Sequence, residues 1–407
     1  MAKQTLTDIK PTKEKILLRV DFNIPLHNDG SLSDETRLKA VLPTINYLLE
    51  QKCRIIICSH LGSPGGKVVE NLRLKPVGLR LAELIGKPVL TLSDCIGPEI
   101  EQVVSEMAEG DVILLENLRF HPGEEANDHE FTKSLARLAD IYINDAFAVS
   151  HRSHASIVGV PKYLPSAIGF LMEKELMVFG KALNNPERPF TVIVGGAKVS
   201  DKLGTLDHIV DKVDVILIGG GMVATFLKSR GYKVGASPVE VNRLEYVHSI
   251  TKRAKSLNVK LMIPRDVLVA ERPDTDANVV MLPINRIPEG WFIVDIGLVT
   301  AGIFIEEIKK SRTVIWNGPM GIFEIPKFAR STRLIAQNLS ELDITTIIGG
   351  GSTAEAVTAM GFADRMSHVS TGGGASLEFL EGKELPGVAA ILEACAKDDS
   401  RITYNVF

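Results

Sequence analysis

One local pattern recurs along the chain and restricts its fold more than any other feature. Short runs of aliphatic and β-branched residues are followed by loops rich in glycine or polar side chains, and then by helical stretches. Continuous apolar runs of this length are typical of parallel strands that helices bury on both faces. The pattern predicts an α/β fold of doubly wound parallel sheets. The runs are Lys15–Val20, Arg54–Cys58, Asp111–Leu115, Ile141–Ile143, Phe190–Val194, Val213–Ile218, Lys260–Ile263, Thr313–Ile315, Ile344–Ile348 and His368–Ser370.

The length of the chain predicts more than one such sheet. With 407 residues it exceeds the size of one ordinary hydrophobic core, so two domains are expected. Residues 170–183 have a helical pattern that ends at Asn184, Asn185 and Pro186. We therefore predict two Rossmann-like domains, over residues 1–168 and 184–387, joined by an interdomain helix over 169–183.

Charge and hydropathy restrict the partners of the chain. Lysine and arginine number 46 against 50 acidic residues, a net charge of −4 that gives no general attraction to nucleic acid or anionic membranes. Charged residues interrupt positions 1–15, where a secretory signal would need an apolar core. The longest apolar stretch, Val215–Leu227, contains three glycines and is too short to span a bilayer. We expect small-molecule partners, no nucleic acid and no membrane.

The four cysteines indicate a reducing compartment. Cys53, Cys58, Cys95 and Cys395 form neither a CxxC pair nor a zinc-ligand spacing. Free thiols are the expected state, which fits a cytoplasmic protein better than redox or metal chemistry does.

The residues that follow the runs differ between the two halves of the chain. In parallel sheets of this kind, ligands bind beyond the carboxyl ends of the strands. The first half has polar and basic side chains at these points, and the second half has glycine loops. This division predicts a site for an anionic small molecule in the first half and a nucleotide site in the second. The polar set is Asp21, Asn23, His60, Glu116, Arg119, Asp145, His151 and Arg152, and the glycine set is Gly195–Gly196, Gly219–Gly221, Gly318, Gly349–Gly351 and Gly372–Gly374.

Two readings of the glycine loops remain open. Gly349–Gly351 precedes a helical stretch over Thr353–Met360, and freed N–H groups at a helix start bind anions. Tight turns also need glycine for backbone reasons alone. Neither GxxxxGK[ST] nor a helix-opening GxGxxG is present. Lys198 and Lys202 would share one helix face if a helix begins there, either around an anion or as a solvated basic face.

Six segments spread across nearly the whole chain form a recognisable set. They are Arg19–Val–Asp–Phe–Asn23, Ser59–His–Leu–Gly62, Glu116–Asn–Leu–Arg–Phe120, Gly195–Gly–Ala–Lys–Val–Ser–Asp–Lys202, Trp316–Asn–Gly–Pro–Met–Gly–Ile–Phe–Glu324 and Ser370–Thr–Gly–Gly–Gly–Ala–Ser–Leu–Glu378. In residues, order and spacing they resemble the phosphoglycerate kinase family. Gly382–Gly387 also matches the family's C-terminal signature, after which the resemblance implies that the tail, residues 388–407, packs back on the first domain.

The resemblance implies reversible phosphoryl transfer between ATP and the carboxylate of 3-phosphoglycerate, in glycolysis, gluconeogenesis or carbon fixation. Mg2+ would accompany the nucleotide, and the protein would be a monomer. The implied catalytic pair is Arg37 and Lys198, which neutralise the transferring phosphoryl group after the domains close. The implied 3-phosphoglycerate residues are Asp21, Asn23, Arg37, His60, Ser63, Arg119 and Arg152. The implied nucleotide residues are Lys198, Lys202, Gly219, Gly220, Ile293, Asn317, Gly318, Pro319, Glu324, Gly350, Gly351, Ser352, Thr353, Gly372 and Gly373.

Two positions depart from the family pattern. Ser63 stands where the family has an arginine, so weaker 3-phosphoglycerate binding is expected unless Lys67 or Arg73 compensates. Ser352 stands where the family has a metal-holding aspartate, which weakens its assignment as a metal residue. Ser352 and Glu355 have the spacing of a capping box, which offers a purely structural role at the helix start.

Three functions remain in competition. An active kinase keeps Arg37, Lys198 and Glu324 in place. Ser63 and Ser352 favour a low-activity nucleotide-binding relative with a regulatory or interaction role. An NAD-dependent dehydrogenase lacks its glycine fingerprint and its acidic ribose partner. The retained residues favour the active kinase.

Overall fold

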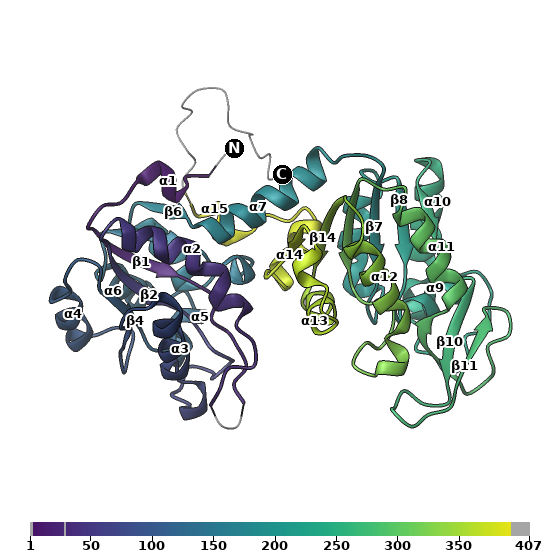
Figure 1. Cartoon of the computed structure of the whole chain (residues 1–407), viewed down its shortest axis with the longest axis horizontal. Coiled ribbons are helices and arrows are strands. Elements are labelled where there is room, and N and C mark those ends of the chain that lie inside the picture. The colour runs from purple at the N-terminus through teal and green to yellow at the C-terminus, as the bar shows by residue number, and fades with distance from the viewer. Residues whose placement is uncertain (1–2, 28–29, 392–407) are drawn as a thin grey trace. The chain divides into compact units, whose positions relative to one another are not determined.

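The computed structural model describes all residues except 1–2, 28–29 and 392–407. The chain divides into two compact units (Figure 1). Unit 1 runs to Met177 and resumes at Glu384, and unit 2 runs from Val178 to Lys383. The division falls inside helix α7 (Phe170–Asn184), which extends one residue beyond the predicted helical range.

Unit 1 contains one six-stranded parallel sheet. In spatial order its strands are β3 (Leu90–Thr91), β4 (Val112–Leu114), β2 (Arg54–Cys58), β1 (Lys15–Arg19), β5 (Ile141–Asn144) and β6 (Ser166–Ile168). The helices of unit 1, apart from its part of α7, are α1 (Leu6–Ile9), α2 (Thr36–Glu50), α3 (Lys75–Ile85), α4 (Pro98–Ser105), α5 (Pro122–Glu125), α6 (His129–Ala136) and α15 (Pro386–Ala389). Short helical turns are η1 (Glu70–Leu72), η2 (Leu118–Phe120), η3 (Phe147–Val149), η4 (Ala155–Gly159) and η5 (Val160–Lys162).

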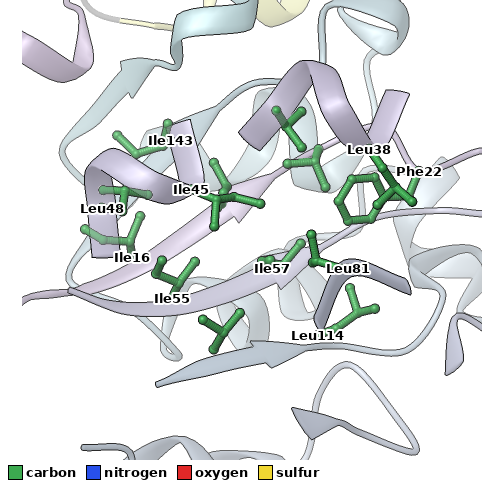
Figure 2. Packing of buried hydrophobic residues seen from close by; sticks show 14 of the residues in the cluster. Ile16, Phe22, Leu38, Ile45, Leu48, Ile55, Ile57, Leu81, Leu114 and Ile143 are labelled. Carbon is green, nitrogen blue, oxygen red and sulfur yellow. The ribbon is translucent and has the colours of Figure 1, made fainter. Parts of the chain in front are cut away.

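Both faces of this sheet are buried, as the continuous apolar runs predict. Ile16 of β1 lies in register with Ile55 of β2, and these side chains belong to the core on one face. Leu17, which points to the opposite face, is also fully buried. In Figure 2, Ile45 and Leu48 of α2 lie over Ile16 and Ile55. Helix α2 therefore covers the sheet with its apolar side.

Unit 2 contains a second six-stranded parallel sheet. Its strands are, in spatial order, β15 (His368–Val369), β14 (Thr345–Gly349), β13 (Thr313–Asn317), β7 (Phe190–Val194), β8 (Val215–Ile218) and β9 (Lys260–Met262). The helices are α8 (Leu203–Ile209), α9 (Val223–Ser229), α10 (Leu244–Ser256), α11 (Leu298–Ile308), α12 (Arg330–Ser340), α13 (Gly351–Ala359) and α14 (Gly374–Leu380). Short turns are η6 (Ser200–Lys202), η7 (Val241–Arg243), η8 (Pro326–Phe328) and η9 (Ala363–Arg365).

The doubly wound fold class is confirmed, and every predicted strand run contains a strand. One feature of unit 2 was not predicted: a three-stranded antiparallel sheet of β11 (Val279–Pro283), β10 (Asp266–Ala270) and β12 (Phe292–Ile296). Strand β11 is largely exposed and does not alternate regularly between apolar and polar residues, so neither strand signal reveals it.

The last described residues of the chain pack against the segment of unit 1 that ends at Met177. Gly387 donates its N–H to the Ser150 carbonyl at 2.8 Å, and its own carbonyl accepts a hydrogen bond from Asn144 Nδ2 at 3.2 Å. Lys3 Nζ donates to the Ile391 carbonyl at 3.1 Å. Of the predicted tail, residues 392–407 lie outside the described residues. Across the residues that are described, no helix combines the length and the hydropathy needed to cross a membrane.

Helix α3 provides a test of the core assignment. Leu81 is fully buried in the sheet core, whereas Leu79 on the same helix is 62% exposed. Leu81→Ala should lower the free energy of unfolding of unit 1 by about 2–5 kcal/mol, because it leaves a cavity. Leu79→Ala should change it by less than about 0.5 kcal/mol. Urea unfolding measures both variants, and equal effects would contradict the packing of α3.

Candidate functional site

The predicted residues of unit 1 lie at the switch point of its sheet, where the order in which strands are added changes direction at β1. Strand β1 is hydrogen-bonded to β2 on one side and to β5 on the other, so the loops after these strands leave the same edge. In doubly wound sheets this switch point is where ligands bind. Asp21 and Asn23 follow β1, His60 follows β2, and Arg119 follows β4 within η2.

Hydrogen bonds tie these loops to one another. The Phe22 N–H donates to Ser59 Oγ at 2.8 Å, and the Gly62 N–H donates to Asn23 Oδ1 at 2.8 Å. Arg119 Nη1 donates to the Gly62 carbonyl at 2.8 Å. The loops after β1, β2 and β4 thus form one connected frame, and the predicted residues Asn23 and Arg119 are part of its hydrogen bonds.

Arg37 joins this frame from the first turn of α2. Its Nη1 lies 2.6 Å from Asp21 Oδ2 and donates to the Asn23 carbonyl at 3.2 Å. Asp21 is buried, while the Arg37 side chain keeps 30% of its surface exposed. Asp21 therefore orients the guanidinium group, whose remaining donors are available to an anion.

His60 is buried and electrically neutral. Burial first, and then the charges of Arg19 and Arg119, lower the pKa of His60 well below its usual range. Arg19 Nη2 lies 3.3 Å from His60 Nδ1, and because a guanidinium only donates, Nδ1 accepts. The proton of the ring is then on Nε2, which can donate a hydrogen bond to a ligand oxygen. Asp21 Oδ1, 3.8 Å from Nδ1, forms no ion pair with the neutral ring.

A buried network behind His60 was not predicted from the sequence. Arg19 Nε donates to Ser156 Oγ at 2.8 Å, and Ser156 Oγ donates to Glu124 Oε1 at 2.6 Å. Glu124 is fully buried, and burial raises the pKa of its carboxyl group. The sequence offered one signal of this network: Arg19, a charged residue near the end of an apolar run and the first residue of a motif named above.

Arg119 and Arg152 add positive charge to the same region. Burial chiefly lowers the pKa of Arg119, and the charges of Arg19 and Arg152 lower it further. Glu125 forms an ion pair with Arg119 Nε at 3.2 Å. Arg152 and Ser63 are exposed. Several guanidinium groups that disfavour one another's charge are typical of a site that binds an anion.

Arg73 has other partners and is not a ready replacement for the arginine missing at position 63. Its guanidinium pairs with Glu70 at 2.7 Å and with Glu116 at 3.0 Å, and it lies 5.9 Å from the centre of the Phe120 ring. Lys67 is exposed, as Ser63 is.

In unit 2 the switch point lies at β7, which has β13 on one side and β8 on the other. The glycine loops after these strands touch through their backbones. A Cβ atom on Gly195 would lie 2.2 Å from the Pro319 carbonyl oxygen, and one on Gly220 would lie 2.5 Å from the Gly196 nitrogen. These glycines are required by the packing of the loops themselves.

The two predicted lysines do not share a helix face, so that expectation was wrong. Lys198 precedes the first helical turn, and Lys202 ends the short turn η6. The turn begins late because Glu240 Oε2 accepts the N–H groups of Val199 and Ser200 at 2.6 and 3.1 Å. Lys198 is exposed.

Lys202 and Asn317 form the polar centre of the site in unit 2. Lys202 Nζ donates to Asn317 Oδ1, and burial lowers the pKa of this lysine. Asn317 is fully buried, and its Nδ2 has no hydrogen-bond partner among the described residues. An amide donor that is buried without an acceptor indicates a ligand oxygen at this point.

The start of α13 is open in a way that the switch-point loops are not. Gly350 is the N-cap with a φ of 83°, and Gly351 is the first helical residue. A Cβ atom on Gly351 would meet nothing within 4 Å. The packing of the protein therefore does not require this glycine, and its lack of a side chain leaves the helix N-terminus free to receive a phosphate group.

The capping-box expectation for Ser352 was wrong. Ser352 is the second residue of α13, and no side chain caps this helix, because Gly350 occupies the N-cap position. The Ser352 side chain is exposed. Thr353 is buried, and its Oγ1 accepts the Gly318 N–H at 2.6 Å, which ties α13 to the loop after β13.

The remaining predicted residues lie on separate elements of unit 2. Ile293 is in β12 of the unpredicted antiparallel sheet, where its N–H donates to Ser237 Oγ at 2.8 Å. Glu324 is exposed in the turn before η8. Gly372 and Gly373 precede α14, and a Cβ on Gly373 would also meet nothing within 4 Å.

The donor set of unit 2 suits phosphate groups better than a bare metal ion. Lysine ammonium groups, an amide Nδ2 and helix N–H groups all bind anions. At the start of α13 the Ser352 hydroxyl replaces the family's carboxylate. A magnesium ion that arrives with nucleotide phosphates keeps waters and phosphate oxygens as ligands, so these residues fit it as part of a nucleotide complex.

Fold and candidate sites together define a two-unit α/β protein whose sheets each carry, at the switch point, side chains and N–H groups suited to anionic ligands. The family model for phosphoglycerate kinase matches residues 6–383. The chain therefore belongs to the phosphoglycerate kinase family.

Individual relatives and solved structures support this membership. The phosphoglycerate kinase of Pelotomaculum thermopropionicum is 50% identical over 393 residues, which cover 97% of this chain and 100% of the relative. That of Dictyoglomus turgidum is 51% identical over 395 residues, 96% of this chain and 99% of the relative. The structure of phosphoglycerate kinase from Coxiella burnetii has a TM-score of 0.85 at 36% identity, covering 95% of this chain and 98% of the other. The enzyme from Pyrococcus horikoshii has a TM-score of 0.82 at 31% identity, with the same coverage.

The basic region of unit 1 affects the pKa of His154, and this allows a prediction of how stability depends on pH. Burial, followed by the charges of Arg119, Arg19 and Arg152, lowers the pKa of His154 to about 4 from 6.5. The unfolded chain then binds more protons between these values. The contribution of His154 to stability is therefore complete above about pH 6.5 and is lost as the pH falls toward 4. NMR titration of the imidazole should give the low midpoint, and Arg119→Gln should raise it. A midpoint near 6.5 would contradict the buried, basic surroundings.

Proposed function

We propose that this chain is an active phosphoglycerate kinase, which transfers a phosphoryl group reversibly between ATP and the carboxylate of 3-phosphoglycerate. Membership of the family supports the reaction and its place in glycolysis. The observation that carries the proposal is the pairing of two anion sites in one chain. One is a frame of oriented guanidinium groups, and the other is an open helix start beside an unpartnered amide.

In the proposed substrate site, charge and geometry suit 3-phosphoglycerate. Its carboxylate is planar and its phosphate is tetrahedral, and an arginine guanidinium group can bind two oxygens of either group at once. Arg119 and Arg152 are assigned to one anionic end, and Arg37 to the carboxylate that reacts. Asp21 and Asn23 orient Arg37, and His60 donates from Nε2. Ser63 supplies a hydroxyl where a further guanidinium is missing.

In the proposed nucleotide site, Lys198 and Lys202 bind phosphate oxygens, and Asn317 Nδ2 donates to one of them. The N–H groups at Gly350 and Gly351 receive the phosphate chain, with Ser352 beside it. The adenosine is assigned to Ile293, Gly219, Gly220 and Pro319, and its ribose to Glu324. Gly318 and Thr353 hold the loop after β13, and Gly372 and Gly373 lie at the second helix start. Mg2+, bound to the nucleotide phosphates, supplies further neutralisation of their charge.

The chemistry needs no general base in this protein. The acceptor carboxylate is ionised at pH 7 and attacks the γ-phosphorus directly. The work of the residues is positioning and neutralisation of the charge on the transferring group. We assign this neutralisation to Arg37 for the acceptor and to Lys198 for the phosphoryl group. The acyl phosphate that forms hydrolyses readily, so water must be excluded during transfer.

Ser63 and Ser352 favour one alternative, a relative that binds nucleotide but turns over slowly and has a regulatory or interaction role. Against this alternative, Asp21 orients Arg37, and Lys202 contacts Asn317, whose amide donor has no partner among the described residues. We further propose a cytoplasmic monomer. The described cysteines, Cys53, Cys58 and Cys95, are free thiols, which is typical of a reducing compartment.

Turnover of the purified chain tests the function. ATP, 3-phosphoglycerate and Mg2+ should give ADP and 1,3-bisphosphoglycerate, and a chelator should stop the reaction because the phosphate charge is then uncompensated. Arg37→Ala should lower kcat by at least about a hundredfold, while ATP binding is kept. Nucleotide binding without turnover by the unmodified chain would instead support the low-activity alternative.

Position 63 tests the substrate assignment. Ser63→Arg should lower the KM for 3-phosphoglycerate by about tenfold, because a charge-assisted hydrogen bond contributes about 1.5–3 kcal/mol. The KM for ATP should not change. Ser105→Arg, at an exposed serine of α4 outside the proposed site, is the control for added charge. An unchanged KM for 3-phosphoglycerate in Ser63→Arg would show that the missing guanidinium is unimportant here.

A further inference from the structure

A second cluster of metal-binding side chains lies in unit 1, outside the proposed substrate residues. Asp94, Cys95 and His121 bring a carboxylate oxygen, a thiol sulfur and an imidazole nitrogen within 4.8 Å of one another. Asp94 and Cys95 lie in the loop between β3 and α4, and His121 directly follows η2. None of the three takes part in the proposed reaction.

The three side chains are held in place by contacts of their own. His121 Nε2 lies 2.6 Å from Asp94 Oδ1. The same oxygen accepts the Cys95 N–H at 2.6 Å, and the Glu116 N–H donates to the Asp94 carbonyl at 3.3 Å. The ring of Phe131 packs against the imidazole, with 5.4 Å between the ring centres. The ligand atoms therefore converge before any ion arrives.

Burial gives the cluster a closed side and an open side. Cys95 is fully buried, whereas the side chains of His121 and Asp94 are 30% and 49% exposed. An ion could enter from the exposed side, reach the sulfur at the bottom and keep a water molecule as its fourth ligand. Three protein ligands and one water are the arrangement of open zinc sites.

We propose that Asp94, Cys95 and His121 form a binding site for a zinc-class divalent cation. Sulfur, imidazole and carboxylate together favour zinc over magnesium or calcium, which prefer oxygen ligands alone. Zinc bonds of about 2.0–2.3 Å place ligand atoms of a tetrahedron roughly 3.3–3.8 Å apart, so the side chains need to move by only about 1 Å. On binding, the S–H bond of Cys95 breaks, a Zn–S bond forms, and the proton passes to solvent. The hydrogen bond from His121 Nε2 to Asp94 Oδ1 also breaks, and the imidazole binds zinc through Nε2 after the ring proton has moved to Nδ1.

The site has a defined relation to the rest of unit 1. It joins the loop after β3 to the segment that follows β4, two elements that are separate in the chain. His121 is two residues after Arg119, so a bound ion would fix the end of the segment that carries this arginine. The site itself does not depend on the proposed function, because its ligands can be tested by metal binding alone.

Zinc titration of the metal-free full chain against a chromophoric chelator tests the site. One equivalent of Zn2+ should bind in the presence of excess Mg2+ and ADP, which occupy the proposed nucleotide site. Cys95→Ser and Asp94→Asn should each weaken this binding by at least about tenfold. Cys53→Ser, at a buried thiol outside the cluster, should leave it unchanged, as should Cys395→Ser and His248→Asn.

Cobalt provides a readout of the ligands themselves. Co2+ should give a thiolate-to-metal charge-transfer band in the unmodified chain and in Cys53→Ser, and no such band in Cys95→Ser. Asp94→Asn, at a half-exposed carboxylate, guards against the possibility that Cys95→Ser fails to fold. The proposal is overturned if no Zn2+ binds, if Mg2+ and ADP displace it, or if the loss follows Cys395→Ser rather than the cluster variants.

Discussion

The close approach of glycine backbones at the switch point of unit 2 is the constraint on which its site depends. Gly195 and Gly318 lie so near each other that a Cβ on Gly318 would fall 2.2 Å from the Gly195 carbonyl carbon. This contact brings together the loops after β7 and β13, and with them Lys202 and Asn317. A side chain at either glycine would separate the loops and break the polar centre.

Glycine has two physical roles in this unit, and the sequence does not distinguish them. At Gly195 and Gly220 the backbone of a neighbouring loop leaves no room for a Cβ atom. At Gly351 there is room, since nothing lies within 4 Å, yet no side chain is present. The first role explains how the loops pack. The second leaves a helix N-terminus open, which the packing alone does not explain and which a bound phosphate does.

Most of the parallel framework could be predicted because each buried strand is a continuous apolar run. The edge strands β3 and β6 are too short to form such a run, and β11 is largely exposed. Strands β10 and β12 are buried over most or all of their length, and the prediction missed them although burial alone does not explain why. Local rules failed where a distant residue decides the outcome. Glu240 accepts the N–H groups of Val199 and Ser200 where the turn before α8 begins, so Lys198 lies outside this turn. At α13, Gly350 is the N-cap residue, the position that Ser352 was expected to occupy.

Interactions between distant segments explain what the sequence motifs left out. Arg19 ends β1, Glu124 lies in α5 after β4, and Ser156 lies in η4 after β5. They meet because these parallel strands all end at one edge of the sheet. Cys95 and His121 show the same effect. Spacing along the chain made Cys95 look like an isolated thiol, because zinc spacings describe ligands on one local motif. A parallel sheet brings together loops of strands that are far apart in sequence, so ligand sets assembled this way are visible only in the fold.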